Sequence, residues 1–181
     1  VVPHAFDLSK YEKEYPPIDL EPLDGNYTFY YIGEFTKRKN IEDLVIAFHL
    51  AFGQSEPVAL LLKLSRPGHS DDAIMKSVSD LCTQVKQSLR IYGNNELYRK
   101  EIIVTQHLTK EQIIRLHKRC NCFVLTSHGE AWNIPTFDAI GLGNLVIASN
   151  YGGPKDFVHP DFLIDVQESP CQGMHETFSF N

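Results

Sequence analysis

From Tyr27 onward, short apolar runs alternate with segments of helical spacing, and this alternation limits the folds open to the chain. The run from Val58 to Leu64 is almost unbroken in its apolar character, as expected of a strand buried on both faces. Ile41 to Phe52 instead has its apolar residues at the spacing of one helix face. Strands that alternate with helices indicate βαβ units, a parallel sheet and right-handed crossovers. We therefore predict an α/β fold: a doubly wound, mostly parallel, Rossmann-like sheet in a single domain.

The other elements follow from the same reasoning. Strands are predicted at 27–32, 58–64, 101–105, 122–126, 145–149 and 162–166. Helices are predicted at 41–52, from Ser70 to about Tyr92, from Thr109 to about Lys118 and at 135–142, with one further turn at 154–158. Ser70 is the expected N-cap of its helix, and Thr109 with Gln112 forms a capping-box pattern.

Three regions follow from this pattern. Residues 1–26 are predicted to be an interdomain linker and an irregular segment that is not packed, because 8–26 is rich in Pro, Asp, Glu and Lys. Residues 27–167 carry the alternation and form the predicted domain. Residues 168–181 show no clear pattern and are predicted to be a tail or a truncated element. The chain begins with Val1 and not with Met, which leaves open an upstream segment.

Composition excludes several classes of protein. The formal net charge of −6 argues against general nucleic-acid binding, although it leaves room for a local basic pocket. No apolar run approaches the ~20 residues that span a bilayer. The four cysteines (Cys82, Cys120, Cys122 and Cys171) lack zinc-ribbon and redox spacing, and a reducing, cytoplasmic setting is expected. Cys120 and Cys122 flank the start of an apolar strand and are expected to be inert thiols in or near the core. No group of residues has metal-ligand spacing, and we infer no metal site.

Ligands of a parallel sheet bind beyond the carboxyl ends of its strands, which selects five loops. They are 33–40, 65–70, 106–109, 127–134 and 150–155. In the fourth, Glu130 is expected above the sheet and Asp138 about one turn into the helix that Pro135 begins. Both carboxylates then face one ligand, and the free N–H groups of the helix start lie between them. This arrangement suits a polyhydroxylated ligand with phosphate, although each carboxylate alone is also explained as a helix-dipole partner.

The first loop is the most basic. The run Lys37-Arg38-Lys39 before a helix fits a diphosphate, and a solvated basic turn explains it equally well. Glu34 beside the run opposes phosphate binding unless it pairs with a cation. Lys63 is costly to bury in its apolar strand, so we expect it to point into the ligand cleft; the alternatives are snorkelling to solvent and pairing with an acid.

Weaker signals come from the remaining loops. His107 and His128 lie in ligand-side loops, where a single histidine is more often an ordinary surface residue. The segment Asn150 to Pro154 offers backbone N–H groups to anions, and ordinary turn chemistry explains it as well.

Four segments match, in order, the motifs of one family. Residues 1–7 look like its linker strand V-I-P-N/H-G-V-D, and 30–40 look like its V-G-R-L-x-x-x-K-N/G turn. Residues 127–139 are similar to S-x-x-E-G-F-G-L-P-x-x-E-A, and 143–153 to G-x-P-V-I-A-S-x-x-G-G. Together they resemble the C-terminal, donor-binding domain of GT-B-fold glycosyltransferases, specifically the retaining family 4. The likeness spans nearly the whole chain.

This resemblance implies roles by position. Glu130 would bind hydroxyls of the donor sugar, and Lys39 would bind the diphosphate and stabilise the leaving group; these two are the candidate catalytic residues. Asp138 would accept hydrogen bonds from the ribose. The other candidate donor-binding residues are Gly33, Glu34, Arg38, Lys63, the backbone of Ala131, Trp132, Asn133 and Ile134, and, around the base, His107 and Leu108.

The chain departs from the family pattern at three places. Asp138 stands for a glutamate, which keeps the charge and shortens the reach. Ala131 and Asn133 stand for glycines, although Asn tolerates a positive φ. Glu34 stands for the phosphate-binding arginine, so Lys63 or Arg38 is the candidate to supply the missing charge.

The resemblance implies a hexosyl-type retaining glycosyltransferase as the full-length protein, cytoplasmic or peripheral to a membrane. Its donor would be a UDP- or GDP-linked sugar, and no metal or other cofactor is expected. The acceptor, a glycan or other molecule of cell-surface polysaccharide synthesis, would bind an N-terminal domain absent here, so this chain alone is expected to transfer little or nothing. The alternatives are a non-catalytic, degenerate sugar-nucleotide-binding or scaffold domain, favoured by Glu34, and a GT-B-fold sugar-nucleotide epimerase.

Overall fold

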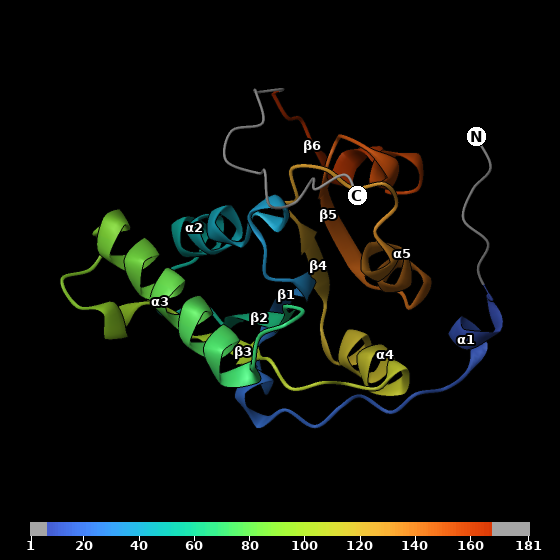
Figure 1. Ribbon diagram of the computed structural model, residues 1–181, viewed down its shortest axis with the longest axis horizontal. Helices are drawn as coiled ribbons and strands as arrows, with labels where there is room; N and C mark the ends of the chain where they lie inside the picture. Colours follow the sequence, from blue (N-terminus) through green and yellow to red (C-terminus); the bar gives the residue numbers. More distant parts are fainter. Residues whose placement is uncertain (1–6, 168–181) are drawn as a thin grey trace.

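The computed structural model describes residues 7–167, which form one six-stranded sheet with helices on both faces (Figure 1). All neighbouring strands pair in parallel, in the order β3-β2-β1-β4-β5-β6. The strands are β1 (Tyr27–Glu34), β2 (Val58–Ser65), β3 (Glu101–Val104), β4 (Cys122–Leu125), β5 (Leu145–Ser149) and β6 (Leu163–Ile164). This is the strand order of a Rossmann fold. The predicted doubly wound α/β fold is confirmed.

The helices divide between the two faces because the chain winds in opposite directions from β1. α2 (Ile41–Ala51) and α3 (Asp71–Leu89) cover one face, and α4 (Lys110–Arg119) and α5 (Ile134–Gly141) cover the other (Figure 1). The predicted caps are present: Ser70 Oγ accepts a hydrogen bond from the Ala73 N–H, and Thr109 with Gln112 forms a capping box. Short helical turns complete the chain: α1 (Ser9–Glu12), η1 (Glu21–Leu23), η2 (Lys37–Lys39), η3 (Asn95–Leu97), η4 (Gly153–Asp156) and η5 (Pro160–Phe162).

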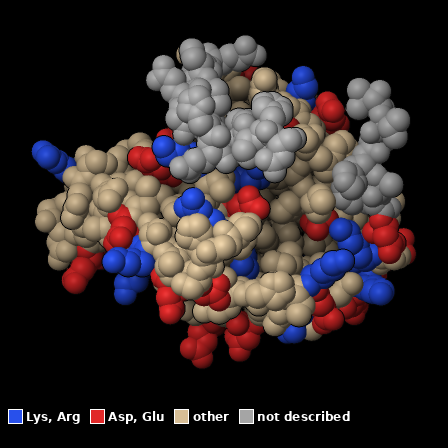
Figure 2. Space-filling view, viewed as in Figure 1, with Lys and Arg blue, Asp and Glu red and all other residues tan. Residues whose placement is uncertain are grey.

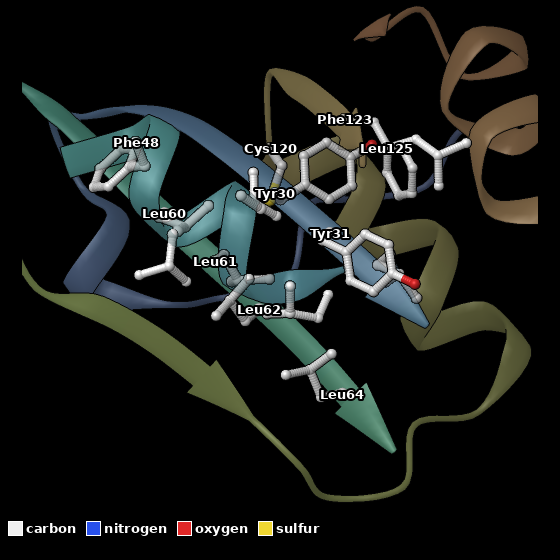
Figure 3. Close-up of a cluster of buried hydrophobic side chains, with 14 of the residues drawn as sticks. Tyr30, Tyr31, Phe48, Leu60, Leu61, Leu62, Leu64, Cys120, Phe123 and Leu125 are labelled. Carbon is white, nitrogen blue, oxygen red and sulfur yellow. The ribbon is translucent and has the colours of Figure 1, made fainter. Parts of the chain in front are cut away.

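The core lies on both sides of the neighbouring strands β1 and β2. Tyr30 and Tyr31 on β1 are fully buried, as are Leu60, Leu61 and Leu62 on β2. Figure 3 shows these side chains together with Phe48 from α2 and Phe123 from β4. A strand flanked by helices on both faces can bury every side chain, which explains the unbroken apolar run in the sequence.

The segment before β1 differs from the prediction. We predicted that 8–26 is irregular and not packed, but Leu23 is fully buried in the core, and α1 forms one helical turn. The intervening chain runs along α4, where the Ile18 N–H donates to the Arg115 carbonyl (3.2 Å) and Arg115 Nε donates to the Pro16 carbonyl (3.0 Å). These contacts depend on α4, more than ninety residues later, so local composition could not reveal them.

Other differences are small. The predicted helix to Tyr92 ends at Leu89, because Arg90 adopts a left-handed conformation (φ 52°) and caps it. The last strand is shorter than predicted, since a turn occupies Pro160–Phe162. The predictions for 1–6 and for the tail lie outside the described residues.

The surface and the thiols fit an ordinary globular domain. Within residues 7–167, no helix combines the length and the apolar character needed to cross a membrane. On the face in Figure 2, acidic and basic side chains are mixed among uncharged ones. Cys120 and Cys122 are free and buried as predicted, and Cys82 is free and buried as well. Burial raises the pKa of Cys82 and of Cys120 to about 12. Cys171 lies outside the described residues.

Candidate functional site

The candidate site lies where the sheet changes winding direction, between β1 and β4. The chain leaves β1 toward one face of the sheet and leaves β4 toward the other, so the two following loops enclose a crevice at the carboxyl edge. The backbone joins the loops directly: the His128 N–H donates to the Arg38 carbonyl (2.9 Å), and Thr126 Oγ1 donates to the Asn40 carbonyl (2.9 Å). The first and fourth predicted ligand loops therefore form one unit.

A charged group occupies the centre of this unit. Lys39 Nζ lies 2.5 Å from Glu130 Oε1, and Arg38 Nη1 lies 3.3 Å from Glu130 Oε2. Arg38 also donates to the Gly129 carbonyl at 2.7 Å. The side chains of Lys39 and Glu130 are only 11% and 9% exposed, so water screens the pair weakly. Burial alone would raise the pKa of Glu130, but the hydrogen bond and charge of Lys39 outweigh it and lower that pKa.

The basic run is held in place by its own backbone. Lys37–Lys39 form the 3-10 turn η2, and Asn40 ends it in a left-handed conformation (φ 52°) that Asn tolerates better than most residues. Asn40 Nδ2 then donates to Asp43 Oδ2 in the first turn of α2. This geometry separates the cations: Lys37 is exposed, while Arg38 and Lys39 turn toward Glu130.

The start of α5 is built by Asn133. It adopts φ 64°, as a glycine would, and its Oδ1 accepts hydrogen bonds from both the N–H (3.0 Å) and the hydroxyl (2.7 Å) of Thr136. The expectation that Asn tolerates the positive φ of this family glycine is confirmed.

Two glycines of the β5–η4 loop press against the backbone beside Glu130. The Gly153 N–H donates to the Glu130 carbonyl at 3.1 Å. A Cβ on Gly153 would overlap the carbonyl oxygen of Ala131, and one on Gly152, at φ 73°, would overlap that of Glu130. The anion-binding interpretation of this loop is therefore wrong for the Gly153 N–H, because the protein itself uses that donor.

The side chain of Trp132 turns away from the charged group into an aromatic cluster. Its ring lies 4.9 Å from that of Phe157 and 5.7 Å from that of Phe137, centroid to centroid. Ile134 is 46% exposed at the helix start.

Asp138 lies about one turn into α5, where two residues of the N-terminal segment reach its carboxylate. Tyr11 Oη donates to Asp138 Oδ1 at 2.6 Å, and Lys10 Nζ lies 2.7 Å from the same oxygen. Sequence reasoning missed Tyr11 and Lys10, because a polar segment without periodicity carries no signal of what it contacts.

Two buried hydroxyls beside the charged group were also missed. Tyr31 Oη and Ser127 Oγ are buried, and neither forms a hydrogen bond of good geometry with a described residue. Burial is the main cause that raises the pKa of Tyr31, and the charge of Glu130 adds to it. The Tyr31 hydroxyl fills the space where a Cβ on Gly33 would lie, which explains the need for glycine at that position.

Four other predicted residues form no contact with this group that involves their side chains in a hydrogen bond or ion pair within residues 7–167. Lys63 is buried, but its Nζ donates to the Leu64 carbonyl (3.3 Å), and burial lowers its pKa while Asp71 counteracts that effect. Glu34 is exposed and forms no ion pair within residues 7–167, so it is not neutralised by the adjacent cations. His107 is exposed and Leu108 packs against the core; neither is hydrogen-bonded to the charged group in the described chain.

A comparison with protein families matches residues 72–169 to the model described as glycosyl transferases group 1. This match covers more than half of the chain. The chain belongs to this family. The fold agrees, and the predicted kinship with the C-terminal domain of GT-B-fold glycosyltransferases is confirmed.

Individual relatives agree with this assignment. The chain is 28% identical over 116 residues to the serotype-specific mannosyltransferase WbdA of Escherichia coli, a match that covers 62% of the chain and only 12% of the enzyme. Sucrose-phosphate synthase from Thermosynechococcus elongatus is similar with a TM-score of 0.65 and 26% identity, over 92% of the chain and 39% of the synthase. The C-terminal domain of the glycosyl transferase group 1 protein LpcC from Francisella tularensis has the same fold (TM-score 0.65, 17% identity), over 96% of the chain and 85% of that domain.

Proposed function

We propose that this glycosyltransferase domain binds a nucleotide-diphosphate sugar, for retaining transfer by a family 4 enzyme. The observation that carries the proposal is the Lys39–Glu130 pair, which lies at the carboxyl edge of the sheet beside the start of α5. A sugar diphosphate needs a cation for its phosphates and an acceptor for its sugar hydroxyls. The pair offers both within one hydrogen-bond length.

Binding of the donor would replace Glu130 by the diphosphate as the partner of Lys39 and Arg38. Within the protein, Glu130 compensates the charges of Lys39 and Arg38. An incoming diphosphate would take over the two cations, and Glu130 would then accept hydrogen bonds from the sugar. As the bond from the sugar to the diphosphate breaks, Lys39 would stabilise the charge that develops on the leaving phosphate. Arg38 would supply the charge of the arginine that Glu34 replaces.

The rest of the donor would follow the crevice. The backbone from Ala131 to Ile134 would hold sugar and diphosphate at the start of α5, and Asp138 would accept from the ribose hydroxyls. The base would lie near His107 and Leu108. Lys63 is a weaker candidate for the phosphates than Arg38, because its ammonium group is bonded to the Leu64 carbonyl.

The full-length enzyme would carry further parts. The matched segment spans only 12% of the E. coli mannosyltransferase, so the acceptor-binding domain, and the glycan or other acceptor that it holds, are part of the proposal. The name of the E. coli mannosyltransferase supports a hexosyl donor, and a UDP or GDP leaving group stays a prediction. A cytoplasmic setting and independence of metal ions stay predictions.

A second candidate is a domain that keeps the fold and has lost donor affinity. Glu34 favours it, because this exposed carboxylate at the family's arginine position carries an uncompensated negative charge toward the phosphates.

Calorimetry with UDP, GDP, UDP-glucose and GDP-mannose separates the two candidates. The donor-binding domain binds one nucleotide series at up to millimolar concentration, and Lys39→Met weakens that binding at least ten-fold. Lys37→Met is the matched control, because Lys37 lies in the same turn but is exposed. Absence of binding by any of the four compounds at millimolar concentration would sink the proposal and leave the degenerate domain.

A further inference from the structure

The contact between Asp138 and the N-terminal segment has a consequence for nucleotide recognition. Tyr11 Oη and Lys10 Nζ both bind Asp138 Oδ1, at 2.6 and 2.7 Å. No hydrogen bond from the described residues reaches the other oxygen, Oδ2. A carboxylate held by two donors on one oxygen keeps a fixed orientation and leaves the second oxygen free to accept.

The ring of Tyr11 packs against α5, and this packing fixes the position of its hydroxyl. Gly141, one turn after Asp138, lies beneath the ring, and a Cβ at that position would come within 2.8 Å of the ring atoms. Phe137 adds a ring contact at a centroid distance of 6.4 Å. Burial and the bond to Asp138 raise the pKa of Tyr11, so its hydroxyl keeps the proton that it donates.

The ion pair with Lys10 also compensates the charge of Asp138. The Asp138 side chain is 13% exposed, and an uncompensated carboxylate so near a diphosphate would oppose binding. Lys10 offsets that charge without taking the second oxygen. A glutamate would reach further, so the shorter Asp138 depends more on being held in position.

We propose that Tyr11 and Lys10 are positioning residues, which orient Asp138 so that its Oδ2 accepts hydrogen bonds from the ribose hydroxyls of the nucleotide. This inference rests on the proposed function, because it concerns the ribose end of the same donor site. It extends that site to Lys10 and Tyr11, which lie outside the four family motifs.

The test compares UDP and GDP with their 2′,3′-dideoxy analogues, which lack the ribose hydroxyls. Whichever of UDP and GDP the protein binds more tightly, it binds that nucleotide more tightly than the dideoxy analogue of the same base. Asp138→Asn abolishes this preference. Tyr11→Phe keeps the ring on Gly141 and removes only the donor. It lowers ribonucleotide affinity about five-fold, because Asp138 loses one of the two donors that orient it, and leaves analogue affinity unchanged. Lys10→Met acts in the same direction.

A double-variant cycle shows whether Tyr11 acts through Asp138. Tyr11→Phe has no further effect on binding when Asp138→Asn is already present. The inference is overturned if Tyr11→Phe leaves the ribose preference intact, or weakens both ligands equally, as a purely structural role would. If the unmodified protein binds nucleotides without ribose preference, the inference fails alone; if it binds no nucleotide, the proposed function fails with it.

Discussion

Lys39 and Glu130 lie 91 residues apart in the sequence and 2.5 Å apart in the structure, joined by a buried ion pair. Removing Lys39 leaves the buried Glu130 carboxylate with only the longer ion pair to Arg38 among the described residues. Lys39→Met should therefore lower the free energy of unfolding by about 2–4 kcal/mol, measured by urea denaturation at pH 7. The double variant with Glu130→Gln should recover part of this loss. A double variant less stable than Lys39→Met would show that the pair is not the cause.

Glu34 should oppose phosphate binding. Glu34→Arg is expected to raise the affinity for UDP or GDP about two- to five-fold at low salt, since an exposed charge contributes less than about 1 kcal/mol. The gain should shrink as salt is added. Glu96→Arg makes the same charge change near the opposite edge of the sheet, before β3, and should leave affinity unchanged. An equal gain in both variants would contradict a specific role for Glu34.

The close contact of Gly153 with Ala131 should not tolerate a side chain. Gly153→Ala is expected to destabilise the domain by about 2 kcal/mol or more, because the new Cβ would overlap backbone that cannot move freely. Gly93→Ala serves as the control: it places a Cβ in open space at an ordinary φ and should have little effect. Thermal unfolding of the two variants makes the comparison, and similar midpoints would refute the overlap.

The adjacent Tyr30 and Tyr31 are both fully buried and differ in how their hydroxyls are bonded. Tyr30 Oη bonds His117 Nδ1 (2.6 Å) and Asn144 Nδ2 (2.8 Å), whereas Tyr31 Oη forms no hydrogen bond of good geometry with a described residue. Tyr30→Phe should cost about 1–3 kcal/mol, and Tyr31→Phe should cost nothing or stabilise. Urea denaturation of both variants tests this difference, which a large loss from Tyr31→Phe would disprove.

His117 should make stability depend on pH. Burial is the main cause that lowers its pKa from 6.5 to about 4, so between these values the unfolded chain takes up a proton that the folded chain refuses. The stabilisation is complete above pH 6.5 and is lost as the pH falls toward 4. The shift corresponds to a loss on the order of 3 kcal/mol. His117→Gln should reduce the difference in unfolding free energy between pH 7 and 4.5; an unchanged difference would assign it to other groups.

Most of the fold was predictable, because each element carries its own signal. The apolar run from Val58 to Leu64 and the caps at Ser70 and Thr109 are local patterns, and the structure has a strand and two capped helices at these places. Leu23 was not predictable, since one leucine among prolines and acids has no periodicity and is buried only through long-range packing.

The candidate site was predictable in its parts but not in its pairing. The family motifs indicated Lys39, Glu130 and Asp138, and the strand order explains why the first two meet. No pattern connects Tyr11 with Asp138, or Gly153 with Ala131, because those contacts depend on how loops fold over one another. For Lys63, burial was expected to require an anion, but its ammonium group donates a hydrogen bond to the Leu64 carbonyl.

The position of β4 beside β1 also affects how the domain folds. β1, β2 and β3 can pair in the order of synthesis through short connections, whereas β1 pairs with β4 only after the intervening chain has closed a long loop. Closing that loop costs conformational entropy, which the contacts between β1 and β4 offset only after they have formed. We therefore expect this strand pair to form late in folding. A folding intermediate in which only β1, β2 and β3 are paired already contains the cationic turn of residues 37–39. It still lacks the candidate site, because Glu130 follows β4 and has not yet reached Lys39.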